Sequence, residues 1–187
     1  IEACLSRVTN PLSSLLAAKA VASIVEHLPA AVARPDDPAP REPLALAAML
    51  AGAAFNDTGV TVAHALAHGL GAVLGVPHAT AVAIATPAGL RFNQLAAVEP
   101  LAALADVCGL SGGAPEEKAR AFVEKVCDLL RGVGLPQRTP APAEGRDVLL
   151  DQLAASATAS LRPALVLNPQ KVDPAALRRL FAECLES

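Results

Sequence analysis

The sequence has very little aromatic character, and this absence bears on the kind of core it can build. Among its 187 residues there is no Trp and no Tyr, and Phe occurs only 4 times. Sheets usually recruit aromatic and β-branched residues, whereas alanine and leucine are strong helix formers. Because 53% of the chain is hydrophobic and alanine and leucine dominate, we expect an all-α core of closely packed helices.

Paired cysteines and basic clusters are missing as well. The four cysteines form no C-x-x-C pair, which argues against a zinc knuckle or redox dithiol and favours buried free thiols in a cytoplasmic protein (Cys4, Cys108, Cys127 and Cys184). The formal net charge is −3 and Lys and Arg do not cluster, which argues against nucleic-acid binding. The most apolar run, residues 60–77, contains two histidines. We therefore expect a core helix there and no membrane partner.

Apolar residues recur at helical spacing along most of the chain. After the end of a helix at residues 1–6, we expect helices over residues 11–28, 44–55, 60–74, 78–93, 98–108, 115–131 and 146–157, and one that begins after Asp173. Loops are expected at 29–43, 111–113 and 134–145. Asn10-Pro11 and Asp173-Pro174 each supply an N-cap and a proline suited to the first helical position. The expected fold is a multi-helix bundle of about seven to nine helices, without strands.

Three histidines, which can bind metals, are spaced so that their side chains could meet. His64 and His68 are four residues apart, so on a helix they lie one turn apart on the same face. His78 follows Gly75-Val76-Pro77, where the helical pattern must stop. Two neutral imidazoles can bind a divalent ion, and a third from the next helix can help to complete the site. The alternative is that these are core histidines with satisfied hydrogen bonds. The Glu of an H-E-x-x-H motif is absent, so a zinc protease is not indicated.

Several stretches together resemble the iron-containing, or group III, alcohol dehydrogenases, a family that includes lactaldehyde reductase and maleylacetate reductase. They are IEACLS and NPLSSLLAAKA near the start, MLAGAAFND at 49–57, HALAHGLGAVLGVPHATAVAIATPAGLRFN at 64–93, and ALVLNPQKVDPAALRRLF toward the end. The resemblance implies that residues 1–187 form a single all-helical metal and substrate domain, similar to the dehydroquinate synthase-like C-terminal domain of the family. We expect the N-terminal nucleotide-binding domain of the family to be absent from residues 1–187.

The resemblance also implies roles for individual residues. The family binds Fe²⁺, and sometimes Zn²⁺, through one Asp and three His, and His64 and His78 match the last two of these ligands. His68 matches an unliganded histidine beside the nicotinamide and the substrate that helps in proton transfer, and Phe55 matches a residue of the substrate pocket. The first Asp and His belong to a D-x3-H motif that ends before the position of Ile1. We expect the chain, which opens as if in the middle of a helix, to lack this half of the site and to bind metal weakly by itself.

The implied function is that of a metal-dependent, NAD(P)-linked alcohol dehydrogenase in which the metal polarises the oxygen of a small alcohol or aldehyde. NAD(P) would be bound mainly by the missing domain, the complete enzyme would be a homo-oligomer, and this chain alone would be inactive. A maleylacetate reductase-like activity is an alternative within the family. Two hypotheses without catalysis are a catalytically incompetent helical remnant or subunit that acts by binding a partner, and a metal-binding or scaffold module. Ala79-Thr80 and Thr86-Pro87-Ala88 depart from the Gly and the Leu-Pro-His run that are frequent in the family, which is expected to alter the pocket.

Overall fold

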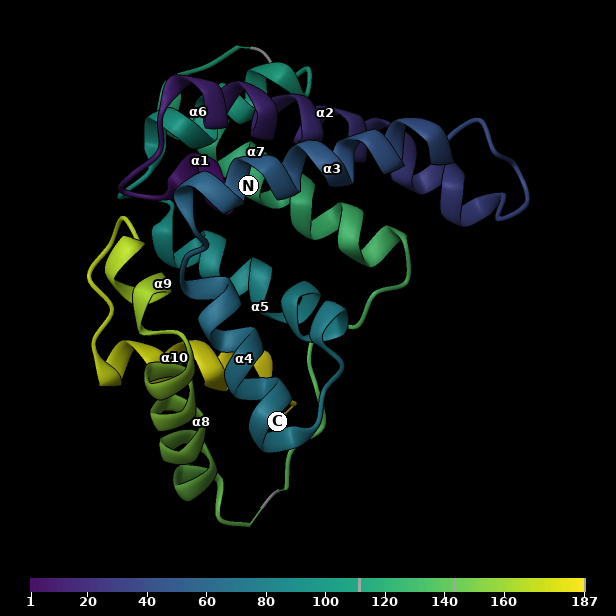
Figure 1. Cartoon of the computed structure of the whole chain (residues 1–187). Coiled ribbons are helices and arrows are strands. Elements are labelled where there is room, and N and C mark those ends of the chain that lie inside the picture. The colour runs from purple at the N-terminus through teal and green to yellow at the C-terminus, as the bar shows by residue number, and fades with distance from the viewer. Residues whose placement is uncertain (111, 143, 187) are drawn as a thin grey trace.

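The structure, a computed structural model, describes residues 1–110, 112–142 and 144–186, and in these it contains ten helices and no strand (Figure 1). The helices are α1 (Glu2–Leu5), α2 (Pro11–Ala33), α3 (Arg41–Thr58), α4 (Val62–Leu74), α5 (His78–Asn93), α6 (Val98–Val107), α7 (Pro115–Gly132), α8 (Arg146–Ser160), α9 (Arg162–Leu167) and α10 (Pro174–Cys184). The expected all-α class is confirmed. Ser111 and Ala143, which fall in two of the expected loops, lie outside the described residues.

Most helices begin and end near their expected bounds, but three expectations were wrong. The loop expected from Pro29 starts later, because α2 continues through this proline to Ala33. Helix α3 begins at Arg41, so Pro43 lies in its first turn, where a backbone N–H has no intrahelical partner to lose. Helix α9 was not expected, because its 6 residues are too few to carry a helical period.

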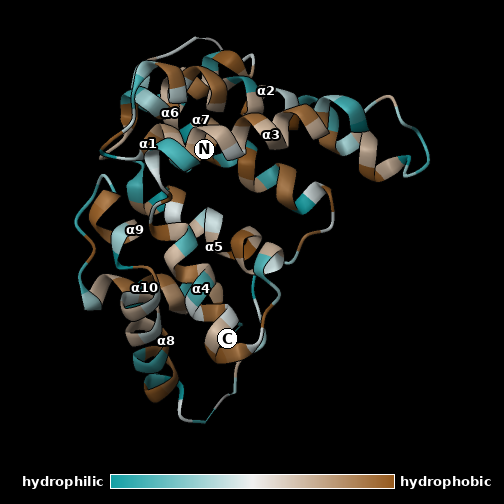
Figure 2. Cartoon of the chain, in the orientation of Figure 1, coloured by the Kyte–Doolittle hydropathy of each residue, from teal (hydrophilic) through white to brown (hydrophobic). Residues whose placement is uncertain are grey.

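The helices pack around two hydrophobic clusters, and α5 contributes to both. One cluster contains the buried faces of α4, α5, α8 and α10. The other is built from α1, α2, α6 and α7 and includes Leu90 of α5. Figure 1 shows α2 and α3 side by side, with their far ends projecting from the rest of the molecule. Figure 2 shows that apolar residues run along most of the helices.

Helix α4 is enclosed by its neighbours on several sides, and two glycines make this close approach possible. A Cβ on Gly69 would stand 2.6 Å from the Phe181 ring of α10 and 3.1 Å from the carbonyl oxygen of Leu153 in α8. A Cβ on Gly89 of α5 would stand 3.0 Å from Cβ of Ala63 in α4. The helix that carries two of the histidines is therefore fixed between α5, α8 and α10.

The apolar run at residues 60–77 forms α4 and the turn after it, and α4 is a buried core helix, as expected. By length and composition alone, α2 is long and apolar enough to cross a membrane. Helices α3 and α4 pass the same test together, although they are bent by 101° relative to each other. Core helices of soluble proteins can also pass this test.

All four cysteines are free, as expected, but they are not equally buried. Cys4 and Cys184 are buried, whereas Cys108 and Cys127 are half-buried, so the expectation of burial was correct only for the first two. Burial raises the pKa of the Cys184 thiol to about 12. A thiol with so high a pKa stays protonated and unreactive at neutral pH.

Candidate functional site

The three histidines come together where α4 and α5 meet. His64 and His68 lie one turn apart on α4, and His78 is the first residue of α5. The ring centroids of His64 and His78 are 5.8 Å apart, and those of His68 and His78 are 5.6 Å apart. Gly75 ends α4 in the left-handed conformation, with φ of 69°, which allows α5 to fold back against α4.

The His64 and His78 rings lie near the separation that two imidazole ligands of one metal ion would have, but they do not enclose an ion. Two imidazoles on a tetrahedral ion, with metal–nitrogen bonds of about 2.0–2.1 Å, place their ring centroids roughly 5 Å apart. The His64–His78 separation of 5.8 Å and the His68–His78 separation of 5.6 Å are both close to this value, so distance alone does not distinguish the two pairs. In the part of the chain that the structure describes, no group of three or more His, Cys, Asp or Glu side chains could hold a metal ion. The chain therefore offers part of a donor set, and imidazole nitrogens suit both Fe²⁺ and Zn²⁺.

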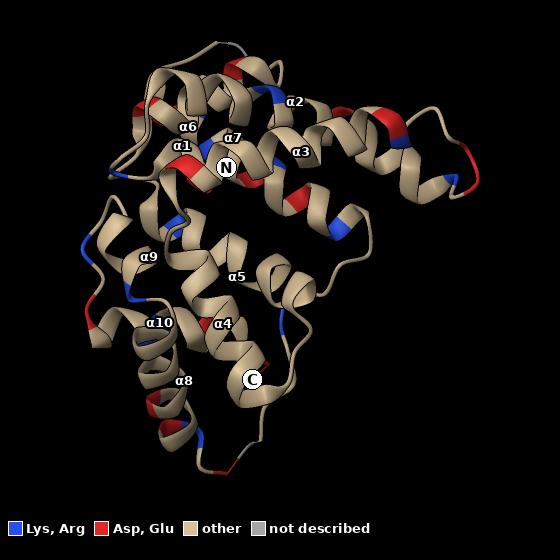
Figure 3. Ribbon diagram, in the orientation of Figure 1, with Lys and Arg blue, Asp and Glu red and all other residues tan. Residues whose placement is uncertain are grey.

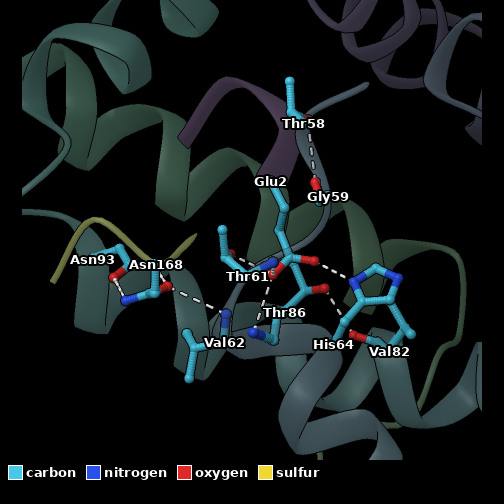
Figure 4. A network of polar contacts seen from close by, with 11 residues as sticks. Glu2, Thr58, Gly59, Thr61, Val62, His64, Val82, Thr86, Asn93 and Asn168 are labelled. Atoms are coloured by element: carbon cyan, nitrogen blue, oxygen red, sulfur yellow. Dashed lines mark hydrogen bonds and ion pairs between the residues drawn. The ribbon is translucent and has the colours of Figure 1, made fainter. Parts of the chain in front are cut away.

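Glu2 of α1 meets His64 across the first turn of α4 (Figure 4). Its Oε2 faces Nδ1 of His64, while its Oε1 accepts hydrogen bonds from the backbone N–H groups of Thr61 (3.0 Å) and Ala63 (3.1 Å) and from the Thr61 hydroxyl. Only 13% of the Glu2 side chain and 27% of the His64 side chain are exposed. Burial of the carboxyl opposes its ionisation, but the hydrogen bonds and charge of His64, with the Thr61 hydrogen bond, outweigh burial and lower the pKa of Glu2.

A buried pair of asparagines completes the N-terminus of α4 (Figure 4). Oδ1 of Asn168 accepts hydrogen bonds from the N–H of Val62 (3.2 Å) and from Nδ2 of Asn93 (2.8 Å). Nδ2 of Asn168 donates to Oδ1 of Asn93 (2.7 Å) and to the carbonyl of Gln170 (2.8 Å). The first N–H groups of a helix have no partner within it. In α4 the N–H groups of Val62 and Ala63 are capped by Asn168 and Glu2, which are distant in sequence.

His68 and His78 are less tightly held than His64. His68 is half-buried and His78 is exposed. Neither ring has a hydrogen-bond partner among the described residues, whereas His64 has Glu2. Burial, followed by the neighbouring His78 and His64, lowers the pKa of His68. The neutral form of His68 is therefore favoured.

A cavity of about 430 Å³ lies beside His64. Most of its wall consists of aliphatic side chains from α2, α3, α5 and α7, among them the half-buried Ile24, Val25 and Leu28 of the amphipathic helix α2. Glu2 is the one charged residue among the described residues of this lining, which include no Lys or Arg. Figure 3 shows that the ribbons of α4 and α5 are nearly free of charged residues.

Phe55 lies on the wall of this cavity, although 47% of it is exposed. Ala79 and Thr86, two of the positions that depart from the family pattern, also line the cavity. His68 and His78 are not among the described residues of its lining. Of the candidate residues, the structure thus places Phe55 and His64 on one cavity, and it places the ring of His78 near those of His64 and His68.

Comparison with known proteins identifies the family. Residues 1–185 match the family described as "Fe-containing alcohol dehydrogenase family, C-terminal". The chain belongs to the iron-containing alcohol dehydrogenase family. It is 33% identical to 1,3-propanediol dehydrogenase of Klebsiella pneumoniae over 139 residues, which cover 73% of this chain and 36% of that protein. It is 32% identical to 1-propanol dehydrogenase PduQ of Salmonella typhimurium (strain LT2) over 190 residues, which cover 99% of this chain and 51% of that protein.

Solved structures of the family share the fold. The crystal structure of 1,3-propanediol oxidoreductase superimposes with a TM-score of 0.88 at 28% identity, covering 98% of this chain and 48% of that one. Maleylacetate reductase from Rhizobium sp. strain MTP-10005 gives a TM-score of 0.74 at 28% identity, with the same two coverages. The chain thus spans about half the length of these proteins and corresponds to the helical C-terminal domain of the family. The resemblance noted from the motifs is confirmed.

Sequence reasoning missed Glu2 and the contact between Asn93 and Asn168, although both asparagines were expected to act as caps or turn formers. Glu2 is 62 residues from His64, and Asn93 is 75 residues from Asn168, so no local spacing could have connected either pair. A single Glu near the start of a chain carries no signal of its own. Only the packing of α1 and of the segment after α9 against the start of α4 brings these side chains together.

Proposed function

We propose that this chain is the C-terminal, metal-binding part of an NAD(P)-linked alcohol dehydrogenase that acts on small, uncharged alcohols and aldehydes. The observation that carries this proposal is the convergence of the His64, His68 and His78 rings beside an apolar cavity, in a chain of this family. His64 and His78 would hold Fe²⁺ or Zn²⁺ together with ligands from the preceding part of the protein. When bound, the metal supplies a Lewis acid for the substrate oxygen, and NAD(P) supplies the hydride chemistry.

The residues of this chain would bind the substrate and move its proton. His68 would exchange a proton with the substrate oxygen beside the nicotinamide, and its place one turn from His64 supports this role. Phe55 and the aliphatic walls of the cavity would bind the carbon chain of the substrate and exclude water from it. Residues 1–187 would form a single helical domain for metal and substrate. This domain would be inactive without the nucleotide-binding domain.

The lining of the cavity supports an uncharged substrate. A carboxylate substrate would be placed beside Glu2 without a basic partner among the described lining residues, and an unpaired buried charge is costly. A maleylacetate reductase-like activity is therefore the second candidate, supported by the likeness to the Rhizobium enzyme. It would need a positively charged partner besides the described lining residues, because maleylacetate is an anion.

We further propose that the complete enzyme is a cytoplasmic homo-oligomer in which a nucleotide-binding domain packs against this one. The chain covers 51% of PduQ, which leaves room for such a domain in the relatives. Leu12, Leu15 and Met49 on α2 and α3 are between 64% and 71% exposed, and these apolar side chains are available for contact with a partner. The four free cysteines support a reducing compartment.

The test uses the complete protein, including the nucleotide-binding domain. We expect it to bind Fe²⁺ or Zn²⁺ and to oxidise small primary alcohols such as 1-propanol with NAD(P). His64→Ala and His78→Ala should each abolish metal retention, whereas His68→Ala should keep the metal and lower turnover by about 10²- to 10⁴-fold. Equal metal loss in all three variants would contradict these roles. Absence of both metal and NAD(P)-linked oxidation in the wild type would favour an incompetent subunit or a scaffold module.

A further inference from the structure

The two carboxylate oxygens of Glu2 serve different partners, as Figure 4 shows. Oε1 accepts hydrogen bonds from two backbone N–H groups and one hydroxyl at the start of α4. Oε2 faces Nδ1 of His64. Capping of α4 needs only the first oxygen, and Asn168 already accepts from Val62. Oε2 of Glu2 is therefore left to interact with the His64 imidazole.

This contact decides which ring nitrogen of His64 carries the proton. An ionised carboxylate can only accept hydrogen bonds, so Nδ1 must be the donor. In a neutral imidazole one nitrogen is protonated and the other keeps its lone pair. Glu2 therefore leaves the lone pair on Nε2, and it also fixes the rotation of the ring. Among the three clustered histidines, His64 alone has such a partner in the described part of the chain.

We propose that Glu2 is a positioning residue for His64, which holds the Nδ1–H so that Nε2 is presented as a metal ligand. The inference rests on the proposed function, because it assumes that His64 binds the metal. Histidines that bind metals commonly donate their second ring N–H to a carboxylate, which fixes the tautomer and strengthens the ligand. In this protein the carboxylate is itself fixed by three further donors at the start of α4, so Glu2 cannot turn away without uncapping the helix.

A Glu2→Gln variant separates this role from helix capping. The three donors around Oε1 require an acceptor, so the carbonyl oxygen of Gln must take that place and its NH₂ group must face Nδ1 of His64. A donor opposite a donor moves the ring proton from Nδ1 to Nε2. The cap is kept, whereas the lone pair that would bind the metal is lost.

The experiment uses the complete protein and two readouts. In the metal-free form, ¹⁵N NMR of the histidine rings should report the Nδ1–H tautomer of His64 in the wild type and the Nε2–H tautomer in Glu2→Gln. Competition with a chelator should show Zn²⁺ affinity lowered by about 10- to 100-fold in Glu2→Gln. Thr61→Val is the matched control, because it removes one donor to Oε1 and leaves the contact with His64 in place. It should change neither the tautomer nor the affinity.

The outcomes separate this inference from the proposed function. If His64→Ala loses Zn²⁺ but Glu2→Gln keeps both the wild-type tautomer and the wild-type affinity, Glu2 is only a cap and the inference is overturned. If His64→Ala keeps Zn²⁺, the proposed role of His64 fails and the inference fails with it. A changed tautomer and weaker Zn²⁺ binding in Glu2→Gln alone, with Thr61→Val unchanged, support the inference.

Discussion

The N-termini of α4 and α5 each bring a histidine to the same place, but they are built differently. At the start of α4, the N–H groups of Thr61, Val62 and Ala63 donate to the side chains of Glu2 and Asn168. At the start of α5, the N-cap is Pro77, and no side chain among the described residues accepts a hydrogen bond from the first N–H groups of the helix. His64 is half-buried against a carboxylate, whereas His78 is exposed.

This difference divides the candidate metal site into a fixed part and a free part. The position of His64 follows from α1, α4 and α9 packing together, so this chain alone determines it. The ring of His78 has no hydrogen-bond partner among the described residues, so no hydrogen bond in that part of the chain fixes its orientation.

The largest effect is expected from breaking the buried cap of α4. Asn168→Leu keeps a side chain of similar size, but it leaves the buried N–H of Val62, the buried amide of Asn93 and the part-buried carbonyl of Gln170 without their partner. We expect the free energy of unfolding to fall by about 3 kcal/mol, because each buried polar group left unpaired is costly. Chemical denaturation of the variant and the wild type measures this loss.

An exposed cap provides the control for this prediction. Asn10 caps α2 by accepting hydrogen bonds from the N–H groups of Leu12 and Ser13, both at 3.0 Å, near the surface. Asn10→Ala should cost about 1 kcal/mol, as is usual for the loss of an N-cap. Equal losses in the two variants would show that burial adds nothing at the start of α4.

Hydrogen exchange compares the two helix starts directly. The backbone N–H groups of Val62 and Ala63 are bonded to side chains, whereas those of Ala79 and Thr80 have no hydrogen-bond acceptor among the described residues. After correction for intrinsic rates, the first pair should exchange on the order of 100-fold more slowly than the second. The measurement is residue-resolved NMR of the metal-free protein. Similar protection in both pairs would mean that the first N–H groups of α5 are also hydrogen-bonded.

Much of the fold could be predicted from the sequence, because helix periods and caps are local signals. Asp173 caps α10, and the stripe of Leu177, Leu180, Phe181 and Cys184 is buried as expected. The expected helix at 78–93 matches α5. Pro29 was misjudged because a proline disrupts only one turn, and the apolar contacts on either side of it can still hold a helix together.

The site was predictable only to the extent that its residues are close in sequence. The spacing of His64 and His68, and the break before His78, indicated that the three rings could meet, and they do. Glu2 and Asn168 act on α4 from 59 and 106 residues away, through contacts that only the packed helices create. The local sequence around Glu2 and Asn168 does not indicate which distant residues they contact. Their role at the site is therefore visible only in the structure.

The smallest effect on the free energy of unfolding is expected from a substitution of His78. This substitution is also the most direct test of the difference between the His64 and His78 positions. In the metal-free protein, His78→Ala should change the free energy of unfolding by no more than about 0.5 kcal/mol, because an exposed ring without a hydrogen bond stabilises little. His64→Ala should cost about 2 kcal/mol under the same conditions, since it leaves one oxygen of the buried Glu2 carboxylate unpaired. Denaturation in the presence of a chelator measures both. If His78→Ala destabilised the protein as much as His64→Ala, the ring of His78 would be held without metal, and the division into a fixed and a free part would fail.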